Sequence, residues 1–305
     1  MHLKRVLKHA RVLIISAFDF DISADFNVRH WSARPVLTQS KDEEVFTLPP
    51  SFLLDGWHGK ISHKALEIHF NPTEPSVGRV YDYSAYSSAV LNGGYQQVKH
   101  YINLHVSPQC IVGVTTPESL FVSYCKPLAL SVDTSIGMMT AASMRSCCIT
   151  TTEIEGQKII VCVTTGLGNL RCAGDKAEYR HLYSPPKKID TINMLIATSA
   201  ALSPAAKVEA LMIATEAKVA ALDSLGLKSV VSGRLATGTG TDALAIVSPE
   251  LKSNSRQIDY VGKHTLFGEA LACLTIKAIT HSASKDIAMS KSVAEKASTA
   301  QHNKS

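Results

Sequence analysis

Alternating apolar and polar residues divide the middle of the chain into short strands. Residues 65–70 alternate with the period of two that is typical of a half-buried strand, and residues 101–106 form a hydrophobic strand-like run. Two further runs, 146–153 and 158–165, are rich in Ile, Val, Thr and Cys, and Glu155-Gly156 separates them. A short Gly-containing turn between two strand-like runs predicts a β-hairpin.

Two segments carry the signals that begin a helix. Thr116 precedes Pro117, and Ser203 precedes Pro204. A hydroxyl residue at the N-cap with Pro at the first helical position predicts a helix in both places. We expect the first helix to run to about residue 126 and the second to residue 225, where Gly226 suits the position after a helix.

The C-terminal half alternates strand-like and helical runs. A strand at 191–198 is followed by the helix from 204, a strand at 243–247 and a helix from about 266. This order predicts a right-handed crossover unit. Residues 137–142 are predicted as a loop entering a helix. The predicted fold class is α+β, with mixed β-sheets covered by long helices, and α/β is the alternative.

Three regions differ in character along the chain. Prolines interrupt short runs in residues 1–60, so we expect an N-terminal extension with a few strands. Residues 61–281 hold the predicted strands and helices and form the main domain. Residues 282–305 are rich in Ser, Ala and Lys, and we expect a disordered tail.

Composition excludes several classes of protein. The 305-residue chain is 45% hydrophobic and carries a formal charge of +5, with basic residues scattered over most of its length. A nucleic-acid-binding protein needs a clustered basic face, so we expect no nucleic acid partner. No apolar run reaches the ~18 residues of a membrane span, so we expect no membrane partner. Seven cysteines without Cys-x-x-Cys spacing predict reduced thiols and a cytoplasmic protein.

The most concentrated candidate chemistry lies in residues 234–242. This stretch contains Thr239, Thr241 and Asp242, with Gly238 and Gly240 between them, directly before the predicted strand 243–247. Glycines let the backbone N–H groups approach a ligand, and the hydroxyls and the carboxylate supply polar chemistry. A Gly/Thr-rich hairpin has the same composition, and Asp242 would then cap a turn.

Other polar loops follow predicted strands. Residues 87–94 combine two hydroxyls with a turn-rich segment, which suits either a tight loop or a backbone cradle. Asn103 lies in a further predicted strand, and Asn169 follows another. The candidate binding residues of these loops are Ser87, Ser88, Asn92, Gly93, Gly94, Asn103 and Asn169.

Three further candidates belong to the predicted helices. His264 follows Lys263 at a helix start, and it is the best acid/base because a histidine titrates near neutrality. A local hydrogen bond at the helix start is its alternative role. Glu216 lies in an alanine-rich segment and is expected to be partly buried, and Glu216 and Lys218 could instead form an ion pair. His58, His63 and His69 match no zinc signature, so we interpret them as solvated or partly buried.

Recognisable catalytic fingerprints such as HExxH, the P-loop and Gly-x-Ser-x-Gly are absent. The loops together resemble the adenosylcobinamide amidohydrolase family over roughly residues 65–280. The blocks that carry the resemblance come in family order: Ser87-Ser88-Ala89 with Asn92-Gly93-Gly94, Asn103, residues 137–142, 165–169, 173–175, 202–206 and 214–218, Thr237 to Ala243, and Gly262 to Thr265 with Gly268-Glu269.

The resemblance implies hydrolysis of one amide of adenosylcobinamide to adenosylcobyric acid and aminopropanol, in the cytoplasm, during corrinoid salvage. It makes residues 61–281 the catalytic domain. The cobalt belongs to the corrinoid substrate, so no cofactor and no protein-bound metal are implied. A non-catalytic corrinoid-binding protein and an amidohydrolase of another amide, acting through an internal threonine, are the alternatives. The oligomeric state is left open.

The roles within such a site follow from the chemistry of amide hydrolysis. His264 would be the acid/base, Asp242 would orient it or activate water, and Glu216 and Lys218 are second-rank candidates. Lys263 would bind substrate. The nucleophile stays open between water, Thr239 or Thr241, and Ser87 or Ser88. Backbone N–H groups at Gly238 and Gly240, or at Gly93 and Gly94, would bind the oxyanion. Asn92, Asn103 and Asn169 would line an open groove for the corrin amides.

Overall fold

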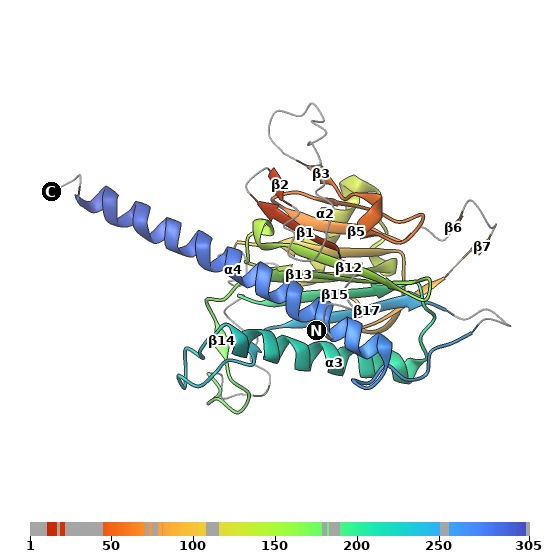
Figure 1. Cartoon of the computed structure of the whole chain (residues 1–305). Helices are drawn as coiled ribbons and strands as arrows, with labels where there is room; N and C mark the ends of the chain where they lie inside the picture. The colour runs from red at the N-terminus through yellow and green to blue at the C-terminus, as the bar shows by residue number, and fades with distance from the viewer. Residues whose placement is uncertain are drawn as a thin grey trace.

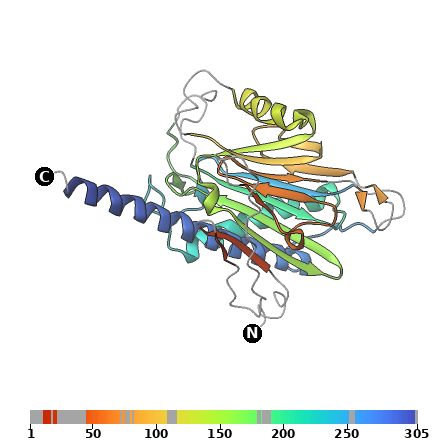
Figure 2. The same ribbon diagram turned by 90° about the horizontal axis from the view of Figure 1, so that it is seen from above.

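Two stacked β-sheets with helices on both outer faces form the molecule (Figures 1 and 2). The layers run from helices α3 and α4 through a large sheet and a small sheet to helix α2. The computed structural model describes residues 11–16, 19–21, 45–70, 73–74, 79–80, 82–107, 116–178, 182, 190–250 and 256–302.

The large sheet has eight strands in the order β2-β1-β12-β13-β15-β17-β8-β9. All neighbours are antiparallel except β15 and β17, which are parallel. Its strands are β1 (Arg11–Ser16), β2 (Asp19–Asp21), β8 (Tyr83–Ser87), β9 (Gly94–Val98), β12 (Cys148–Ile154), β13 (Gln157–Thr165), β15 (Ile192–Thr198) and β17 (Ala243–Pro249).

The small sheet has five strands in the order β11-β10-β5-β4-β3, and only β10 and β11 are parallel. Two short ribbons, β14 with β16 and β6 with β7, lie beside the sheets. These strands are β3 (Phe46–Thr47), β4 (His58–Ile61), β5 (Ala65–His69), β10 (His100–His105), β11 (Ser135–Thr140), β14 (Leu170–Arg171), β16 (Gly238–Thr239), β6 (Thr73–Glu74) and β7 (Arg79–Val80).

Each sheet owes its one parallel pair to a helix that crosses its outer face. Helix α3 (Pro204–Ser224) joins β15 to β17, and helix α2 (Pro117–Cys125) lies between β10 and β11 in the chain. Short 3-10 helices occur at Pro50–Phe52, Lys126–Leu128, Val132–Thr134 and Met144–Ser146. A parallel pair needs such a crossover, because the chain must return to the starting edge of the sheet.

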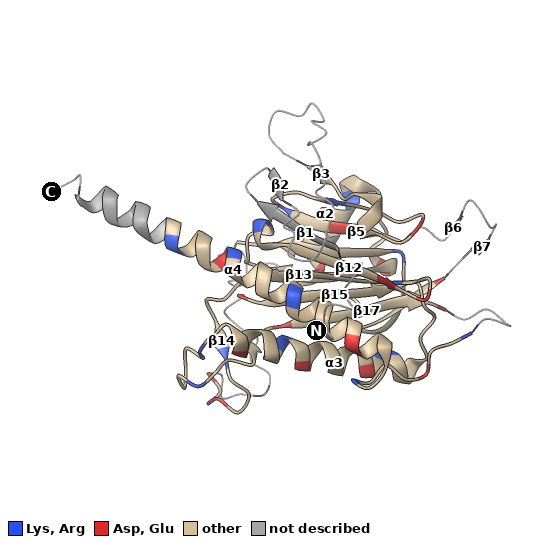
Figure 3. Ribbon diagram, viewed as in Figure 1, with Lys and Arg blue, Asp and Glu red and all other residues tan. Residues whose placement is uncertain are grey.

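Apolar side chains fill all three spaces between the layers. Tyr101, Met138 and Leu195 belong to the core between the sheets. The alanines of α3, with Leu271 and Leu274 of α4 (Leu266–His302), pack on the outer face of the large sheet. Phe121 of α2 packs on the outer face of the small sheet. The central strands β15 and β17 of the large sheet are therefore largely buried on both faces, and neither carries a charged residue. Figure 3 shows acidic and basic residues interspersed on the helices and loops.

The α+β fold class and the strand-helix-strand-helix C-terminal half are confirmed. The predicted hairpin is β12 and β13, and Glu155 and Gly156 both have positive φ, as a type I′ turn requires. Ser203 caps α3 by accepting a hydrogen bond from the Ala206 N–H, and Thr116 caps α2 in the same way. Gly226 has a φ of 64° just after α3.

The prediction of a loop entering a helix at 137–142 is wrong, because most of this segment is strand β11. Gly137 weakens the strand signal but is needed there. A Cβ on Gly137 would lie 2.5 Å from the ring of Phe121, so the glycine lets α2 approach the sheet. Tertiary packing therefore overrides the local propensity of this run.

Both predicted domain limits differ from the structure. The boundary at residue 60 falls inside β4, and Phe52 and Trp57 lie in the core between the sheets. Residues 45–60 therefore belong to the main domain, while most of 1–44 lies outside the described residues. Helix α4 continues to His302, so the predicted disordered tail is helical up to there. Its first half packs on the sheet, and the Ala- and Lys-rich continuation propagates the helix at little cost.

A cluster of histidines lies at one end of β4, β5 and β10. The rings of His58 and His69 stack with centroids 4.6 Å apart, and His69 Nδ1 lies 3.0 Å from His100 Nδ1. His58 and His63 are exposed and His69 is half-buried, which confirms the interpretation of these three side chains as solvated or partly buried. His100 beside them is also half-buried. Burial, with the neighbouring His69, lowers the pKa of His100 to about 4.

We expect this cluster to make the fold sensitive to acid. An unfolded chain takes up a proton at His100 near the ordinary pKa of 6.5, whereas the folded chain does so only near 4. Stability is therefore lost as the pH falls from 6.5 towards 4. The His100→Gln variant should lose less of its Tm between about pH 7 and about pH 5 than the parent does. An unchanged loss would contradict this, and exposed His63→Gln is the control.

Candidate functional site

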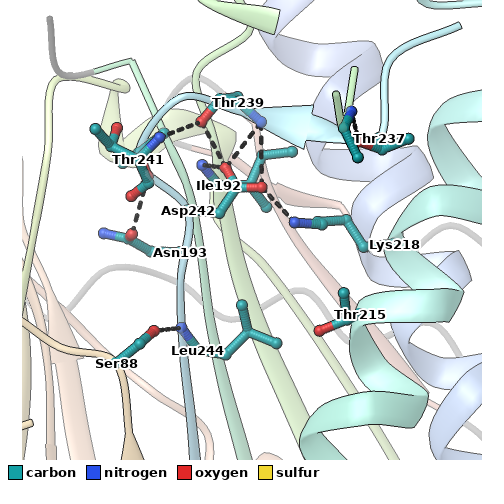
Figure 4. A network of polar contacts seen from close by, with 12 residues as sticks. Ser88, Ile192, Asn193, Thr215, Lys218, Thr237, Thr239, Thr241, Asp242 and Leu244 are labelled. Carbon is teal, nitrogen blue, oxygen red and sulfur yellow. Dashed lines mark hydrogen bonds and ion pairs between the residues drawn. The ribbon is translucent and has the colours of Figure 1, made fainter. Parts of the chain in front are cut away.

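The ends of several strands meet at one edge of the large sheet. Thr165 at the end of β13 is opposite Ile192 at the start of β15, and Asn193 is opposite Ala243 at the start of β17. The turn that precedes β17 therefore lies beside the first residues of β15. We call this place the strand-end site and define it as residues 191–193, Lys218, Thr239, Thr241 and Asp242 (Figure 4).

Asp242 is at the centre of the strand-end site. The Thr239 N–H lies 3.1 Å from both carboxylate oxygens, and the Thr239 hydroxyl donates to Asp242 Oδ1 at 2.5 Å. The N–H of Ile192 donates to the same oxygen at 3.1 Å. Asp242 thus closes the turn, as its alternative role predicts. It also holds a hydroxyl proton, which is the arrangement of a general base and a nucleophile.

Lys218 of α3 forms an ion pair with Asp242 Oδ2 (Figure 4). The two side chains are only 7% and 9% exposed, so little water screens the pair. Gly238 makes room for it, because a Cβ there would lie 2.3 Å from Asp242 Oδ2 and 2.8 Å from Lys218 Nζ. Thr239 and Thr241 remain partly exposed, so a substrate can reach the turn.

Gly240 and Asn169 are brought together beneath the same turn. A Cβ on Gly240 would lie 2.6 Å from Asn169 Nδ2. Asn169 is buried, and its Oδ1 accepts a hydrogen bond from Arg171 Nε at 3.1 Å. Asn169 therefore supports the turn from below, which differs from the expected place on the wall of an open groove.

Asn103 is also buried, with an exposure of 1%. Its Nδ2 donates to Thr164 Oγ1, and its Oδ1 accepts from Asn193 Nδ2, both at 2.8 Å. The expectation that Asn103 lines an open groove for substrate is wrong, because both ends of its amide are engaged inside the protein.

The loop at 87–94 lies against both sheets. Ser88 is exposed and accepts a hydrogen bond at 3.1 Å from the N–H of Leu244, two residues after Asp242. Ser87 instead caps its own turn by accepting from the Ala89 N–H. Asn92 donates to two carbonyls beside β11, and Gly93 lies so close to Ala89 that a Cβ would meet its carbonyl at 2.5 Å. Gly94 has a φ of 88° with open space around it.

The glycine-rich loop at 166–168 is occupied by the protein's own carboxylates. The N–H of Leu167 donates to Asp286 of α4 at 3.1 Å, and a Cβ on Gly168 would lie 2.2 Å from Asp190 Oδ2. Burial raises the pKa of Asp286. This loop therefore anchors α4.

His264, Lys263 and Glu216 lie on another side of α3. Lys263 pairs with Glu216, and both are exposed, at 69% and 51%. The expectation of a partly buried Glu216 is wrong. Residues two positions apart on a helix project about 200° apart, so Glu216 and Lys218 serve different surfaces. The described residues that contact the Asp242 carboxylate are Thr239, Ile192 and Lys218, and His264 is not one of them. The role of His264 as acid/base stays a prediction from the sequence.

Because His264 does not contact the Asp242 carboxylate, we expect its substitution to have little effect on turnover. The side chain is exposed just before α4, so His264→Ala should keep the fold and a turnover within about threefold of the parent. A turnover assay with the corrinoid substrate measures this. A loss of about 10²-fold in a folded variant would instead identify His264 as the acid/base.

Several residues of the site escaped sequence reasoning. Asn193 is a polar residue in a strand whose seven residues are all buried, and that interruption was a usable signal. Lys218 is named by the sequence only as a second-rank candidate and a partner of Glu216, whereas the structure pairs it with Asp242 and pairs Glu216 with Lys263. Thr191 carries no such signal, because threonine is common in strands.

Two further observations concern metal ions and membranes. Across the parts of the chain that are described, no group of three or more His, Cys, Asp and Glu side chains is placed to hold a metal ion. The helices within those same ranges are too short or too polar to cross a membrane.

Comparison with known proteins places the chain in a family. The model of the family described as adenosylcobinamide amidohydrolase (CbiZ) matches residues 80–291. An adenosylcobinamide amidohydrolase of Methanosarcina mazei is 29% identical over 205 residues, which cover 65% of this chain and 88% of the relative. The uncharacterized protein MJ1613 of Methanocaldococcus jannaschii is 30% identical over 149 residues, 44% of this chain and 57% of the relative.

Solved structures show weaker similarity. The PH0078 protein from Pyrococcus horikoshii has a TM-score of 0.37 and 16% identity, with 75% of this chain and 79% of that chain covered. A beta-aminopeptidase from Burkholderia has a TM-score of 0.37 and 15% identity, with 72% and 79% covered. The strand order described above, and not these scores, defines the fold.

The family match covers the strand-end site, the loop at 87–94, helix α3 and helix α4 up to residue 291. The prediction of an amidohydrolase is confirmed at the level of the family. This chain belongs to the adenosylcobinamide amidohydrolase family.

Proposed function

We propose that this protein hydrolyses the aminopropanol amide of adenosylcobinamide, a step of corrinoid salvage. The products are adenosylcobyric acid and aminopropanol, and one water is consumed. The family match supports the substrate class. The observation that carries the reaction type is the Thr239 hydroxyl on the Asp242 carboxylate, beside the buried Lys218.

In the proposed mechanism Asp242 is the general base and Thr239 the nucleophile. Asp242 takes the proton of the Thr239 hydroxyl while Oγ1 bonds to the amide carbon. The tetrahedral intermediate carries an oxyanion, which the Lys218 ammonium next to Asp242 stabilises. The carbon–nitrogen bond then breaks, and the aminopropanol nitrogen takes the proton from Asp242. Water, deprotonated by Asp242, hydrolyses the resulting ester and frees Thr239.

The direct test is incubation of the purified protein with adenosylcobinamide and detection of adenosylcobyric acid by mass. Product supports the proposal. Corrinoid retained on the protein without product rejects it in favour of a binding protein. Thr239→Val should abolish turnover and Thr239→Ser should retain it, because only serine keeps a hydroxyl on Asp242. Full turnover in Thr239→Val would assign the attack to water.

We further propose that the protein needs no metal of its own, since the cobalt enters as part of the substrate. Turnover should therefore be unchanged after treatment with a chelator, which does not extract cobalt from a corrin ring. The assay is repeated in the chelator with and without added divalent cations. Activity that disappears and returns only with a divalent cation would contradict this.

We propose the cytoplasm as the place of action. The cysteines in the described ranges are free thiols, and four of the six are buried. Burial raises the pKa of Cys147 to about 12, which keeps this thiol protonated and unreactive. Reduced thiols are the rule in the cytosol. Recovery of the protein from an oxidising compartment by cell fractionation would reject this assignment.

A further inference from the structure

Two buried amides connect the small sheet to the large sheet behind the strand-end site. Asn103 of β10 and Asn193 of β15 are each 1% exposed. Asn193 Nδ2 donates to Asn103 Oδ1 at 2.8 Å and to the carbonyl of Met139 of β11 at 2.9 Å. Asn103 Nδ2 donates to Thr164 Oγ1 of β13 at 2.8 Å. These bonds fix the start of β15 against three other strands.

The same segment of β15 holds the turn that carries Asp242. The Thr191 hydroxyl donates to the Thr241 carbonyl at 2.7 Å, and the Ile192 N–H donates to Asp242 Oδ1 at 3.1 Å. Thr191 Oγ1 also lies 3.3 Å from Asn193 Oδ1. Residues 191–193 therefore contact the buried amides on one side and the turn on the other.

Packing alone does not account for these amides. The surrounding core is apolar, and burial of an amide is unfavourable unless its hydrogen bonds are made. Asn103 is too buried to contact substrate. A polar network with all its hydrogen bonds made fixes one arrangement of the groups around it, and apolar packing does this less well. A base and a nucleophile that must meet a carbonyl carbon need such a fixed arrangement.

We propose that Thr191, Asn193 and Asn103 are positioning residues, which hold the Thr239–Asp242 turn in place from the small sheet. Thr191 and the N–H of Ile192 act on the turn directly. Asn193 and Asn103 act through them, by fixing the start of β15. This inference rests on the proposed function for its kinetic consequence, whereas its structural consequence can be measured without any activity.

The experiment compares Thr191→Val with Thr191→Ser in the full chain. Valine keeps the shape but loses the hydroxyl bond to Thr241, and serine keeps that bond. We expect Thr191→Val to lower kcat by about 10- to 100-fold with KM within about threefold of the parent. We expect the amide hydrogens of Ile192 and Thr239, which bind Asp242, to exchange about tenfold faster. Thr191→Ser should remain near the parent in all three.

Two more variants separate positioning from a loss of stability. Asn103→Ala removes the far end of the network without touching the turn, and should shift kcat and the two amides in the same direction. Thr150→Val loses a buried hydrogen bond from β12 to the Leu274 carbonyl of α4, which does not involve the turn. It should change neither kcat nor the exchange of the two amides. Thermal unfolding of each variant confirms that the comparison is made on folded protein.

Three results would overturn the proposal. The first is a Thr191→Val variant with the kcat and the amide exchange of the parent. The second is equal impairment of Thr191→Val and Thr191→Ser. The third is a Thr191→Val variant with a raised KM and the kcat of the parent, which indicates that Thr191 contacts substrate. If the parent makes no adenosylcobyric acid, the proposed hydrolysis fails. Amide exchange then decides alone: faster exchange at Ile192 and Thr239 in Thr191→Val supports positioning, and parental exchange overturns it.

Discussion

Asp242→Asn is expected to lower kcat by about 10²- to 10⁴-fold, because asparagine keeps the shape of the side chain but cannot take a proton. The amide oxygen can still accept from the N–H groups of Thr239 and Ile192, so the turn retains bonds that hold it. Turnover of adenosylcobinamide under saturating substrate measures the effect. Glu216→Gln, which neutralises an exposed carboxylate on α3, should stay near the parent.

A second variant guards this test against a loss of fold. Asp242→Asn leaves the Lys218 ammonium buried without its counter-ion, which is destabilising. The double variant Asp242→Asn/Lys218→Met removes both charges and should fold well while staying inactive. A folded Asp242→Asn protein with more than about a tenth of the parental turnover would exclude Asp242 as the base.

Lys218→Met is expected to reduce the free energy of unfolding by about 3–5 kcal/mol, because it leaves the Asp242 carboxylate buried and unpaired. The pair is 7% and 9% exposed, so water cannot replace the lost ammonium. Urea unfolding of the variant and the parent measures the difference. Addition of Asp242→Asn should restore much of the stability, because no charge then remains to be buried unpaired.

The exposed ion pair between Glu216 of α3 and Lys263 offers a matched control for Lys218→Met. Lys263→Met breaks the ion pair with Glu216, which is exposed at 69% and 51%. Water and salt screen such a pair, so its loss should change the free energy of unfolding by less than about 1 kcal/mol. Equal effects of Lys218→Met and Lys263→Met on the free energy of unfolding would show that burial does not determine how much the Asp242–Lys218 pair stabilises the fold.

The expected effects of Asp242→Asn and Lys218→Met both arise from the same buried ion pair. The site keeps a carboxylate and an ammonium in a place with little water, where each depends on the other for its charge. Electrostatic groups act most strongly in such an environment, and they need no reorganisation during the reaction. The two sheets supply that environment, because the turn of Asp242 is held by β15 and, through the buried amides, by the small sheet.

The sequence by itself determined most of the local structure. The hairpin of β12 and β13, the caps of α2 and α3 and the crossover from β15 to β17 follow from turn residues, N-cap hydroxyls and periodicity. The family resemblance also came from short blocks of sequence. The Gly/Thr turn with Asp242 stood out as a candidate in the sequence, although a Gly/Thr-rich hairpin has the same composition.

Tertiary structure decided which polar residues meet. Gly137 looked like part of a loop, and only the ring of Phe121 above it explains a glycine in a strand. Glu216 and Lys218 stand two positions apart in one alanine-rich run, and only the direction in which α3 packs makes one exposed and the other the partner of Asp242. Asn103 and Asn193 are far apart in the chain, and their meeting depends on how the two sheets stack. Local sequence carries periodicity and capping, whereas contacts between sheets depend on the fold as a whole, so a single sequence does not reveal them.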